Sequence, residues 1–302
     1  MIYRPDCIKG GDVTLTEDYL NVISKCTTRH VVDWVMNSKT ILISVIAALT
    51  APAVSAQDMP NVFAEVEVIS GWRADNGTHY AAFDITLADG WKTYWRAPGD
   101  AGIPPIFDWS TSRNLKNVAV SFPVPTVFYE NGMRSVGYDN GLILPLALNA
   151  KNSSEDIRLA GRMTIGVCLD ICVPVELEFD TMLSSTSTTP MPAVVAAMEN
   201  RPMTESEAGV GAIDCEIIPI DDGLRLTALM DIPPMSDEDV AVFELPRPEV
   251  WVSEASMTRR GNTLVASADL IPPDAQPFLL ARDDIRITIL GGGQAIDIRG
   301  CN

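Results

Sequence analysis

Two cysteines separated by three residues, within a segment of β character, constrain the fold of this chain more than any other feature. Residues 157–168 and 172–179 are rich in apolar and β-branched side chains, and Cys168 and Cys172 border a gap that fits a tight hairpin loop. A hairpin brings such residues onto facing strands, where opposite Cα atoms lie within the separation that a disulfide requires. The pair is either a redox-active dithiol/disulfide or a fixed structural disulfide, and the spacing favours neither.

The first half of the chain has the pattern of short antiparallel strands. Apolar residues alternate from Val62 onward, and the turn dipeptides Asp89-Gly90 and Asn131-Gly132 recur at short spacing. Residues 96–109, rich in Pro and Gly, are expected to form a long loop, and Pro145 is expected to mark an edge strand or a bulge. Because strands do not alternate with long helices, an antiparallel sandwich is favoured over a doubly wound or thioredoxin-like fold.

The composition changes after Leu183. A Ser/Thr/Pro-rich stretch begins there, and residues 192–201 are expected to form a short helix with Pro in its first turn. Short strands and turn dipeptides resume near Ala212. The predicted class is therefore all-β, with one sandwich at 57–183, a linker with a short helix at 184–209, and a second, smaller sandwich at 210–302.

The N-terminal residues 1–56 have the layout of a leader that contains a signal peptide. Lys39 precedes an apolar run that is too short to span a bilayer, and small residues end at Ala56. We expect Met36 to be the true start and cleavage to follow Ala56. A retained membrane anchor is the alternative. Export places the mature chain in an oxidising compartment, which we expect to be the periplasm.

Removal of the leader determines the net charge and the number of cysteines of the mature chain. The leader holds five basic and five acidic residues, so the net charge of −18 lies on the mature part, which argues against nucleic acid and anionic lipid as partners. Four cysteines remain after cleavage, and an even number in an exported protein predicts disulfides. Cys215 lies in the first strand of the second sandwich and Cys301 follows its last, so they are expected to form a structural disulfide.

Residues 89–174 resemble the N-terminal periplasmic domain of DsbD-type protein-disulfide reductases, in the branch that includes the ScsB copper-sensitivity suppressors. The stretches that carry the resemblance are Gly90-Trp91-Lys92-Thr93-Tyr94-Trp95-Arg96-Ala97-Pro98-Gly99-Asp100-Ala101-Gly102, Pro104-Pro105 with Phe107-Asp108-Trp109-Ser110, Gly137-Tyr138 with Leu144-Pro145, and Val167-Cys168 with Asp170-Ile171-Cys172-Val173-Pro174. Residues 251–254 and 294–301 resemble the companion region of that branch less specifically.

The resemblance implies an immunoglobulin-like sandwich and a thiol-disulfide oxidoreductase activity in which Cys168 and Cys172 are the catalytic pair. In the family, a membrane domain and a thioredoxin-like domain supply electrons, and the pair reduces exported disulfide isomerases or related thiol proteins. Neither of those donor domains follows in this chain, so the electron donor is expected in trans. The exchange would need no cofactor and no metal.

The family also shields its cysteine pair with an aromatic cap. The corresponding segment here is Phe128 to Gly132, where Asn131 occupies the place of the cap Phe and leaves Phe128 and Tyr129 as candidates. From the residues alone, the aromatic strand that carries Trp91, Tyr94 and Trp95 offers further shielding candidates, although ordinary packing would also account for them.

Two other interpretations of the pair remain open at this level. No Lys or Arg lies within five residues of either cysteine and Asp170 lies between them, a setting that raises thiol pKa values and suits a shielded donor or an inert disulfide. The Cys-x-x-x-Cys spacing also resembles Sco-type copper chaperones, but the only histidine of the mature chain, His79, lies upstream rather than downstream. The other open interpretation is a non-catalytic binding module of two sandwiches, in which the disulfides are structural.

Overall fold

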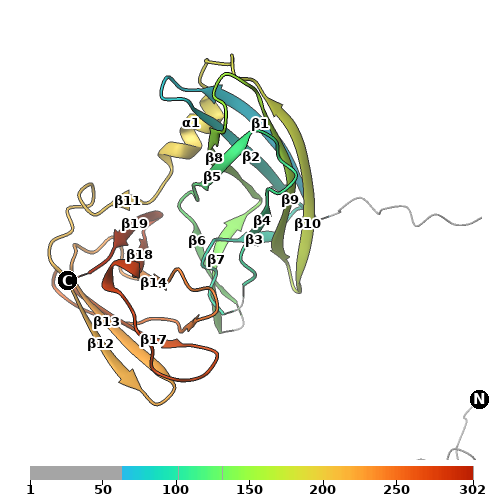
Figure 1. Ribbon diagram of the computed structural model, residues 1–302. Coiled ribbons are helices and arrows are strands. Elements are labelled where there is room, and N and C mark those ends of the chain that lie inside the picture. Colours follow the sequence, from blue (N-terminus) through green and yellow to red (C-terminus); the bar gives the residue numbers. More distant parts are fainter. Residues whose placement is uncertain (1–62, 101, 131, 302) are drawn as a thin grey trace, which may run out of the picture. The chain divides into compact units, whose positions relative to one another are not determined.

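The computed structural model describes residues 63–100, 102–130 and 132–301, and its strands confirm the all-β class and the immunoglobulin-like sandwiches that the sequence predicts (Figure 1). The predicted leader, the start at Met36 and the cleavage after Ala56 lie outside the described residues. None of the helices in the described part of the chain has the length and apolar character of a membrane span.

The first sandwich consists of two antiparallel sheets. The four-stranded sheet has the order β1-β2-β8-β5, with β1 (Ala64–Arg73), β2 (Thr78–Leu87), β8 (Gly141–Ala150) and β5 (Leu115–Val120). The six-stranded sheet has the order β10-β9-β3-β7-β6, with β10 (Cys172–Leu183), β9 (Ile157–Cys168), β3 (Lys92–Tyr94), β7 (Met133–Asp139), β6 (Thr126–Glu130), and β4 (Ile106–Asp108) paired to β9. Alternate residues of both sheets bury one apolar core, which contains Phe83, Leu146, Leu159 and Phe179.

Two details of this sandwich correct the sequence prediction. The Pro- and Gly-rich segment is not a continuous loop, because Ile106 to Asp108 add a short strand beside β9. Pro145 does not lie on an edge strand, since β8 pairs with β2 on one side and β5 on the other. The carbonyl of Pro145 accepts a hydrogen bond from the backbone N–H of Ser121, which lies just beyond the end of β5. The N–H that proline lacks would point to this same place, where the β5–β8 pairing has already ended, so its absence costs no hydrogen bond within the strands.

A short helix and a second sandwich follow. Helix α1 (Pro192–Glu199) packs Val194 against the four-stranded sheet of the first sandwich. The second sandwich has one sheet of order β11-β19-β18-β14, with β11 (Met203–Thr204), β19 (Gln294–Arg299), β18 (Arg286–Gly291) and β14 (Val240–Glu244). Its other sheet has the order β12-β13-β17-β15, with β12 (Ile213–Ile220), β13 (Gly223–Asp231), β17 (Thr263–Ile271), β15 (Trp251–Val252), and β16 (Ser256–Arg260) paired to β17; a 3-10 turn, η2, spans Arg282–Asp284. The domain boundaries expected from the sequence stay a prediction.

The two sandwiches share a buried apolar cluster. Trp95 and Val136 of the first sandwich pack with Val240 and Leu290 of the second. At the border of this cluster the Arg96 guanidinium lies over the Trp95 ring, 3.8 Å from its centroid, and makes two hydrogen bonds of 2.9 Å to the Glu244 carboxylate. Trp95 and Arg96, which directly follow β3, therefore connect the first sandwich to the second.

Candidate functional site

The cysteines of the β9–β10 hairpin lie directly opposite each other at its closed end. Cys168 ends β9, Cys172 begins β10, and a disulfide joins them with their Cα atoms 4.1 Å apart. Cys168 is 8% exposed, whereas Cys172 is exposed, as are all three residues of the connecting loop. The site therefore presents one sulfur-bearing residue to solvent and keeps the other mostly covered.

Tyr94 contacts the exposed member of the pair. Its hydroxyl oxygen lies 2.9 Å from Sγ of Cys172, and because a disulfide sulfur carries no hydrogen, the tyrosine O–H is the donor. Burial raises the pKa of Tyr94, and the Glu130 carboxylate raises it further. The hydroxyl therefore stays protonated at neutral pH and is able to donate to a disulfide sulfur or to the thiolate that replaces it.

Two glycines make room for the Tyr94 ring. A Cβ at Gly166 would lie 2.8 Å from a ring carbon of Tyr94 and 2.6 Å from Cβ of Ile103. A Cβ at Gly102 would lie 2.9 Å from the other side of the ring. The segment after β3 thus folds back over Tyr94 and holds the ring against β9, which fixes the direction in which its hydroxyl points.

Lys92 is a residue of the site that the sequence analysis missed. It pairs across β3 and β9 with Cys168, although 76 positions (168 − 92) separate them in the chain. Its ammonium forms an ion pair with Glu130 and lies 4.6 Å from the centre of the Phe128 ring. Only the pairing of β3 with β9 reveals this neighbour, because counting residues around each cysteine finds no basic side chain.

The aromatic candidates fall into three groups. Tyr94 contacts the pair, and Phe128 and Tyr129 lie on β6, where Phe128 is partly buried under Lys92 and Tyr129 is 64% exposed. Trp91 instead packs on Phe63 with ring centres 4.4 Å apart, and Trp95 is fully buried in the cluster between the sandwiches. Asn131, the residue in the expected cap position, lies outside the described residues.

Exposed apolar side chains gather on the hairpins of the site. Leu169 and Ile171, in the loop between the cysteines, are 45% and 72% exposed. Tyr129 and Met133 are exposed at the end of the β6–β7 hairpin. Lys92 connects this hairpin to the site, because it forms an ion pair with Glu130 and lies on β3 opposite Cys168. Large apolar side chains left in water beside the disulfide favour contact with another protein.

The second disulfide has a different setting. Cys215 of β12 and Cys301 after β19 are joined with their Cα atoms 5.8 Å apart, across a sequence separation of 86 residues. Cys215 is buried in the core of the second sandwich, and its carbonyl accepts a 2.5 Å hydrogen bond from Arg282. This bridge joins the first strand of the five-stranded sheet to the residues after β19, with Cys215 buried and Cys301 partly exposed.

His79 is not part of the cysteine site. It is buried in β2, with Nε2 2.6 Å from the Ser70 carbonyl, and burial lowers its pKa, while Arg73 and Asp156 are the nearby charges. Asp156 immediately precedes β9 and Cys168 ends it, so an extended strand of about 40 Å separates the two places. Within the described residues no group of three or more His, Cys, Asp or Glu side chains has a metal-binding arrangement.

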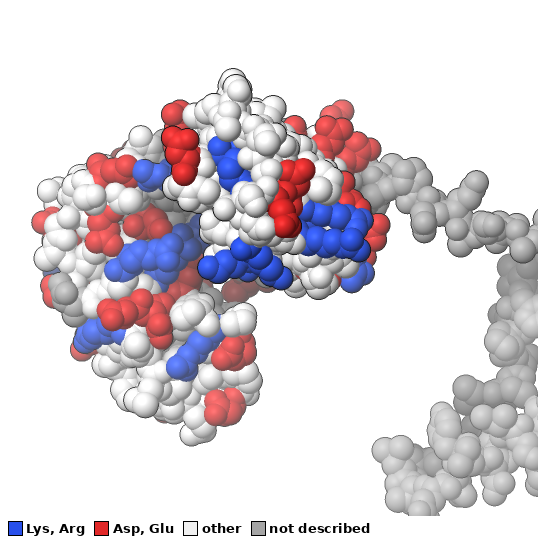
Figure 2. Space-filling model, turned by 45° about the horizontal axis from the view of Figure 1, so that its top comes forward, with Lys and Arg blue, Asp and Glu red and all other residues white. Residues whose placement is uncertain are grey.

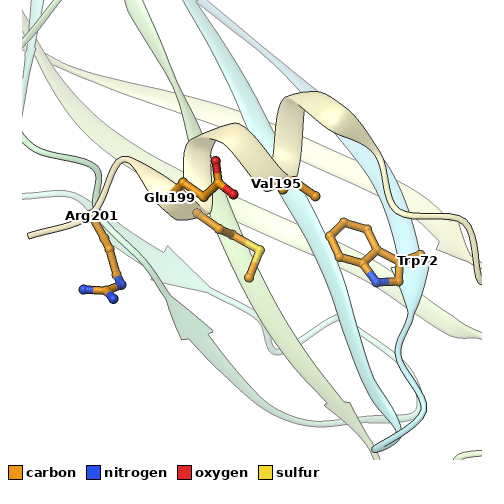
Figure 3. A pocket seen from close by; sticks show the side chains of 5 residues that line it. Trp72, Val195, Glu199 and Arg201 are labelled. Atoms are coloured by element: carbon orange, nitrogen blue, oxygen red, sulfur yellow. The ribbon is translucent and has the colours of Figure 1, made fainter.

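Among the described residues, cavities also lie away from the cysteine pair. One, of about 460 Å³, is bordered by Trp72 and by Val195, Met198 and Glu199 of α1, with Arg201 beyond the helix (Figure 3). Another, of about 770 Å³, lies between residues 96–106 and residues 241–254. On the face shown in Figure 2, acidic and basic side chains are interspersed rather than gathered into one patch of a single sign.

Comparisons with known proteins agree with this architecture. Residues 63–184, which include both cysteines of the hairpin, match the family described as the N-terminal domain of the thiol:disulfide interchange protein DsbD. A solved structure, the N-terminal periplasmic domain of ScsB from Proteus mirabilis, is similar in fold, with a TM-score of 0.61 and 21% sequence identity over 80% of this chain and 95% of that one. No curated protein matches the chain in sequence. The resemblance to DsbD-type N-terminal domains that the sequence indicates is therefore confirmed over residues 63–184.

Proposed function

We propose that this chain is an exported thiol:disulfide interchange module that passes electrons through Cys168 and Cys172 to other proteins. It works in the periplasm after removal of the predicted signal peptide. A thioredoxin-like or membrane protein supplies its electrons in trans, and a disulfide isomerase or related thiol protein receives them. The family match of residues 63–184 supports the reaction class.

The observation that carries the proposal is the position of the pair. The disulfide lies at the exposed end of a hairpin, with Tyr94 donating to Sγ of Cys172 and with Leu169 and Ile171 exposed beside it. A disulfide whose only task is to stabilise a core does not need an exposed sulfur-bearing residue, an aimed hydroxyl and an apolar surface around it. A partner protein that buries the apolar side chains would bring its own sulfur to Cys172.

The exchange balances as two thiol–disulfide steps. In the reduced module the Cys172 thiolate attacks one sulfur of the partner disulfide, forming a mixed disulfide and releasing one partner thiolate. The Cys168 thiolate then attacks Sγ of Cys172, which forms the internal disulfide and releases the second partner thiolate. Two electrons pass to the partner, and a dithiol donor restores the module by the reverse sequence. Tyr94 stabilises the Cys172 thiolate by hydrogen bonding, which lowers its pKa.

The reduction potential of the pair tests the proposal. The mature chain is equilibrated in glutathione or dithiothreitol buffers, and the state of each cysteine is measured by thiol trapping. A potential of about −180 to −270 mV, the range of working exchange proteins, is expected for Cys168 and Cys172. The double variant Cys215→Ser/Cys301→Ser is the matched control and should leave this value unchanged.

A potential well below about −300 mV would place the pair among structural disulfides. The exchange function would then be wrong, and a non-catalytic binding module would be the better interpretation. The Cys168→Ser/Cys172→Ser variant, which keeps the second disulfide, should lose all transfer of electrons to a model disulfide substrate.

A further inference from the structure

Lys92 lies beside the covered sulfur of the pair. Directly opposite residues of antiparallel strands point to the same face with Cβ atoms about 4.5–5.5 Å apart, so the side chains of Lys92 and Cys168 share one face of the six-stranded sheet. A lysine stem is long enough to carry its ammonium from this position either to the sulfur or to the neighbouring hairpin. The backbone pairing therefore gives Lys92 two possible anionic partners.

In the disulfide form the ammonium is engaged by the β6–β7 hairpin. It forms an ion pair with Glu130 and lies over the Phe128 ring. The Lys92 side chain is 20% exposed and that of Glu130 is 50% exposed, so the carboxylate is held in partial contact with water and its bond is readily exchanged. The hairpin that carries the exposed Tyr129 and Met133 is thus tied to the redox site by one charged side chain.

Opening of the disulfide at Cys172 creates a new anion beside Lys92. Attack on Sγ of Cys172 leaves the electron pair of the broken bond on Sγ of Cys168, and this thiolate forms in a place that is 8% exposed. A poorly hydrated thiolate gains from a nearby cation far more than an exposed carboxylate loses when the same cation departs.

We propose that Lys92 is a positioning residue whose ammonium moves from Glu130 to the Cys168 thiolate when the disulfide opens, and so sets how good a leaving group Cys168 is. The inference rests on the proposed exchange function and specifies its regulation. While Glu130 holds the ammonium, Cys168 is a poor leaving group and the module resists small thiols. When an attacking thiolate opens the disulfide at Cys172, the ammonium moves to the Cys168 thiolate and stabilises it.

Other charged and titratable groups surround this arrangement. Asp139 of β7 pairs with Lys92 on the side away from Cys168, Asp170 lies in the loop between the cysteines, and Tyr94 lies two residues along β3. The two carboxylates oppose thiolate formation, whereas the tyrosine hydroxyl donates to Cys172. Of these described groups, Lys92, which the strand pairing places opposite Cys168, is the one whose charge would stabilise a thiolate there.

The test measures the pKa of the Cys168 thiol directly. The mature chain with Cys172→Ser leaves Cys168 as its free thiol while Cys215 and Cys301 stay joined, and the rate of alkylation by iodoacetamide is followed against pH. Lys92→Met should slow the reaction at neutral pH by about threefold to tenfold, and Glu130→Gln should speed it by a similar factor, because one unit of pKa is a tenfold change in thiolate fraction. Lys92→Arg should restore most of the lost rate.

The double variant Lys92→Met/Glu130→Gln separates the exchange of a lysine from simple repulsion between charges. If Lys92 mediates the effect, Glu130→Gln changes the rate by less than about twofold once the lysine is absent. An unchanged effect of Glu130→Gln would show that the carboxylate acts on the sulfur directly and would overturn the proposal. Lys116→Met, on β5 of the other sheet, removes the same charge as a control and should leave the rate unaltered.

This readout does not depend on exchange with a partner. A very low reduction potential would refute the exchange function while the alkylation series still reported on Lys92. Conversely, equal thiol pKa values in all four variants would refute the role of Lys92 and leave the exchange function standing.

Discussion

The two disulfides of this chain illustrate how differently the same bond can be placed. Cys168 and Cys172 are four positions apart and already lie opposite each other through strand pairing, so their bond adds little closure to the chain. Cys215 and Cys301 are 86 positions apart and connect the beginning of the second sandwich to its end. One bond is exposed, hydrogen-bonded and surrounded by apolar side chains, and the other closes a core. The comparison separates a bond in the position proposed for exchange from a bond that closes a domain.

Removing each disulfide by serine substitution should give the largest and most unequal effects. In the chain-entropy model, losing the Cys215–Cys301 bond lowers the free energy of unfolding by about 4–5 kcal/mol, whereas losing the Cys168–Cys172 bond lowers it by about 2 kcal/mol. Urea unfolding of both double variants measures the difference. Equal losses would contradict the expectation that the two bonds differ in how much they close the chain.

Arg96→Met tests how much the Arg96–Glu244 ion pair between the two sandwiches stabilises the protein. The Arg96 and Glu244 side chains are 15% and 16% exposed, so removal of the guanidinium leaves a carboxylate mostly out of water. We expect a loss of about 2–3 kcal/mol in the free energy of unfolding, less than for a fully buried pair. Urea unfolding measures it, and Arg162→Met, whose ion pairs are about half exposed, is the control that should cost less than about 1 kcal/mol.

Gly166→Ala should disturb the Cys168–Cys172 disulfide and leave the Cys215–Cys301 disulfide unchanged. The added methyl group would meet the Tyr94 ring and Ile103 at distances that force a shift, at a cost of about 2 kcal/mol in the free energy of unfolding. The displaced ring would also withdraw its hydroxyl from Cys172. Reduction of each disulfide by dithiothreitol is then followed separately, and the Cys215–Cys301 bond should be unaffected. Thr164→Ala, two residues earlier on β9, should leave both bonds as they are.

The smallest effect is expected from Asp297, at the border between the sandwiches. Burial by itself raises the pKa of this carboxyl, but the hydrogen bonds and charge of Arg286, aided by Arg299, hold it below its ordinary value. A depressed folded-state pKa adds stability above the unfolded value of 3.8, and the gain is lost as the pH falls through the folded pKa.

Asp297→Asn should therefore lower the urea midpoint at neutral pH, and the difference from the unaltered chain should shrink below pH 3.8. The state of Cys168 and Cys172 in redox buffers should be the same in both proteins. A difference that persists in acid would mean that the substitution disturbs packing rather than charge.

The fold was accessible from the sequence because period-two alternation and turn dipeptides are local signals. The hairpin around Cys168 and Cys172 follows from their spacing and from the β character of the residues on either side. What local signals do not contain is the order of strands in a sheet, and this order brings Lys92 beside Cys168 and places the strand of Pro145 in a sheet interior. The sequence does not distinguish Trp91 from Tyr94 as a residue that shields the cysteine pair. The strand geometry does, because it directs Tyr94 toward Cys172.

The shared cluster around Trp95 has a practical consequence for dissecting this protein. The family match ends at residue 184, which suggests that the first sandwich could be excised there. Such a fragment would strip Val240 and Leu290 from Trp95 and Val136 and would leave Arg96, two residues beyond Tyr94, without Glu244. We therefore expect the cooperative folding unit to extend beyond the residues that match the family, and the reduction potential is best measured with both sandwiches present.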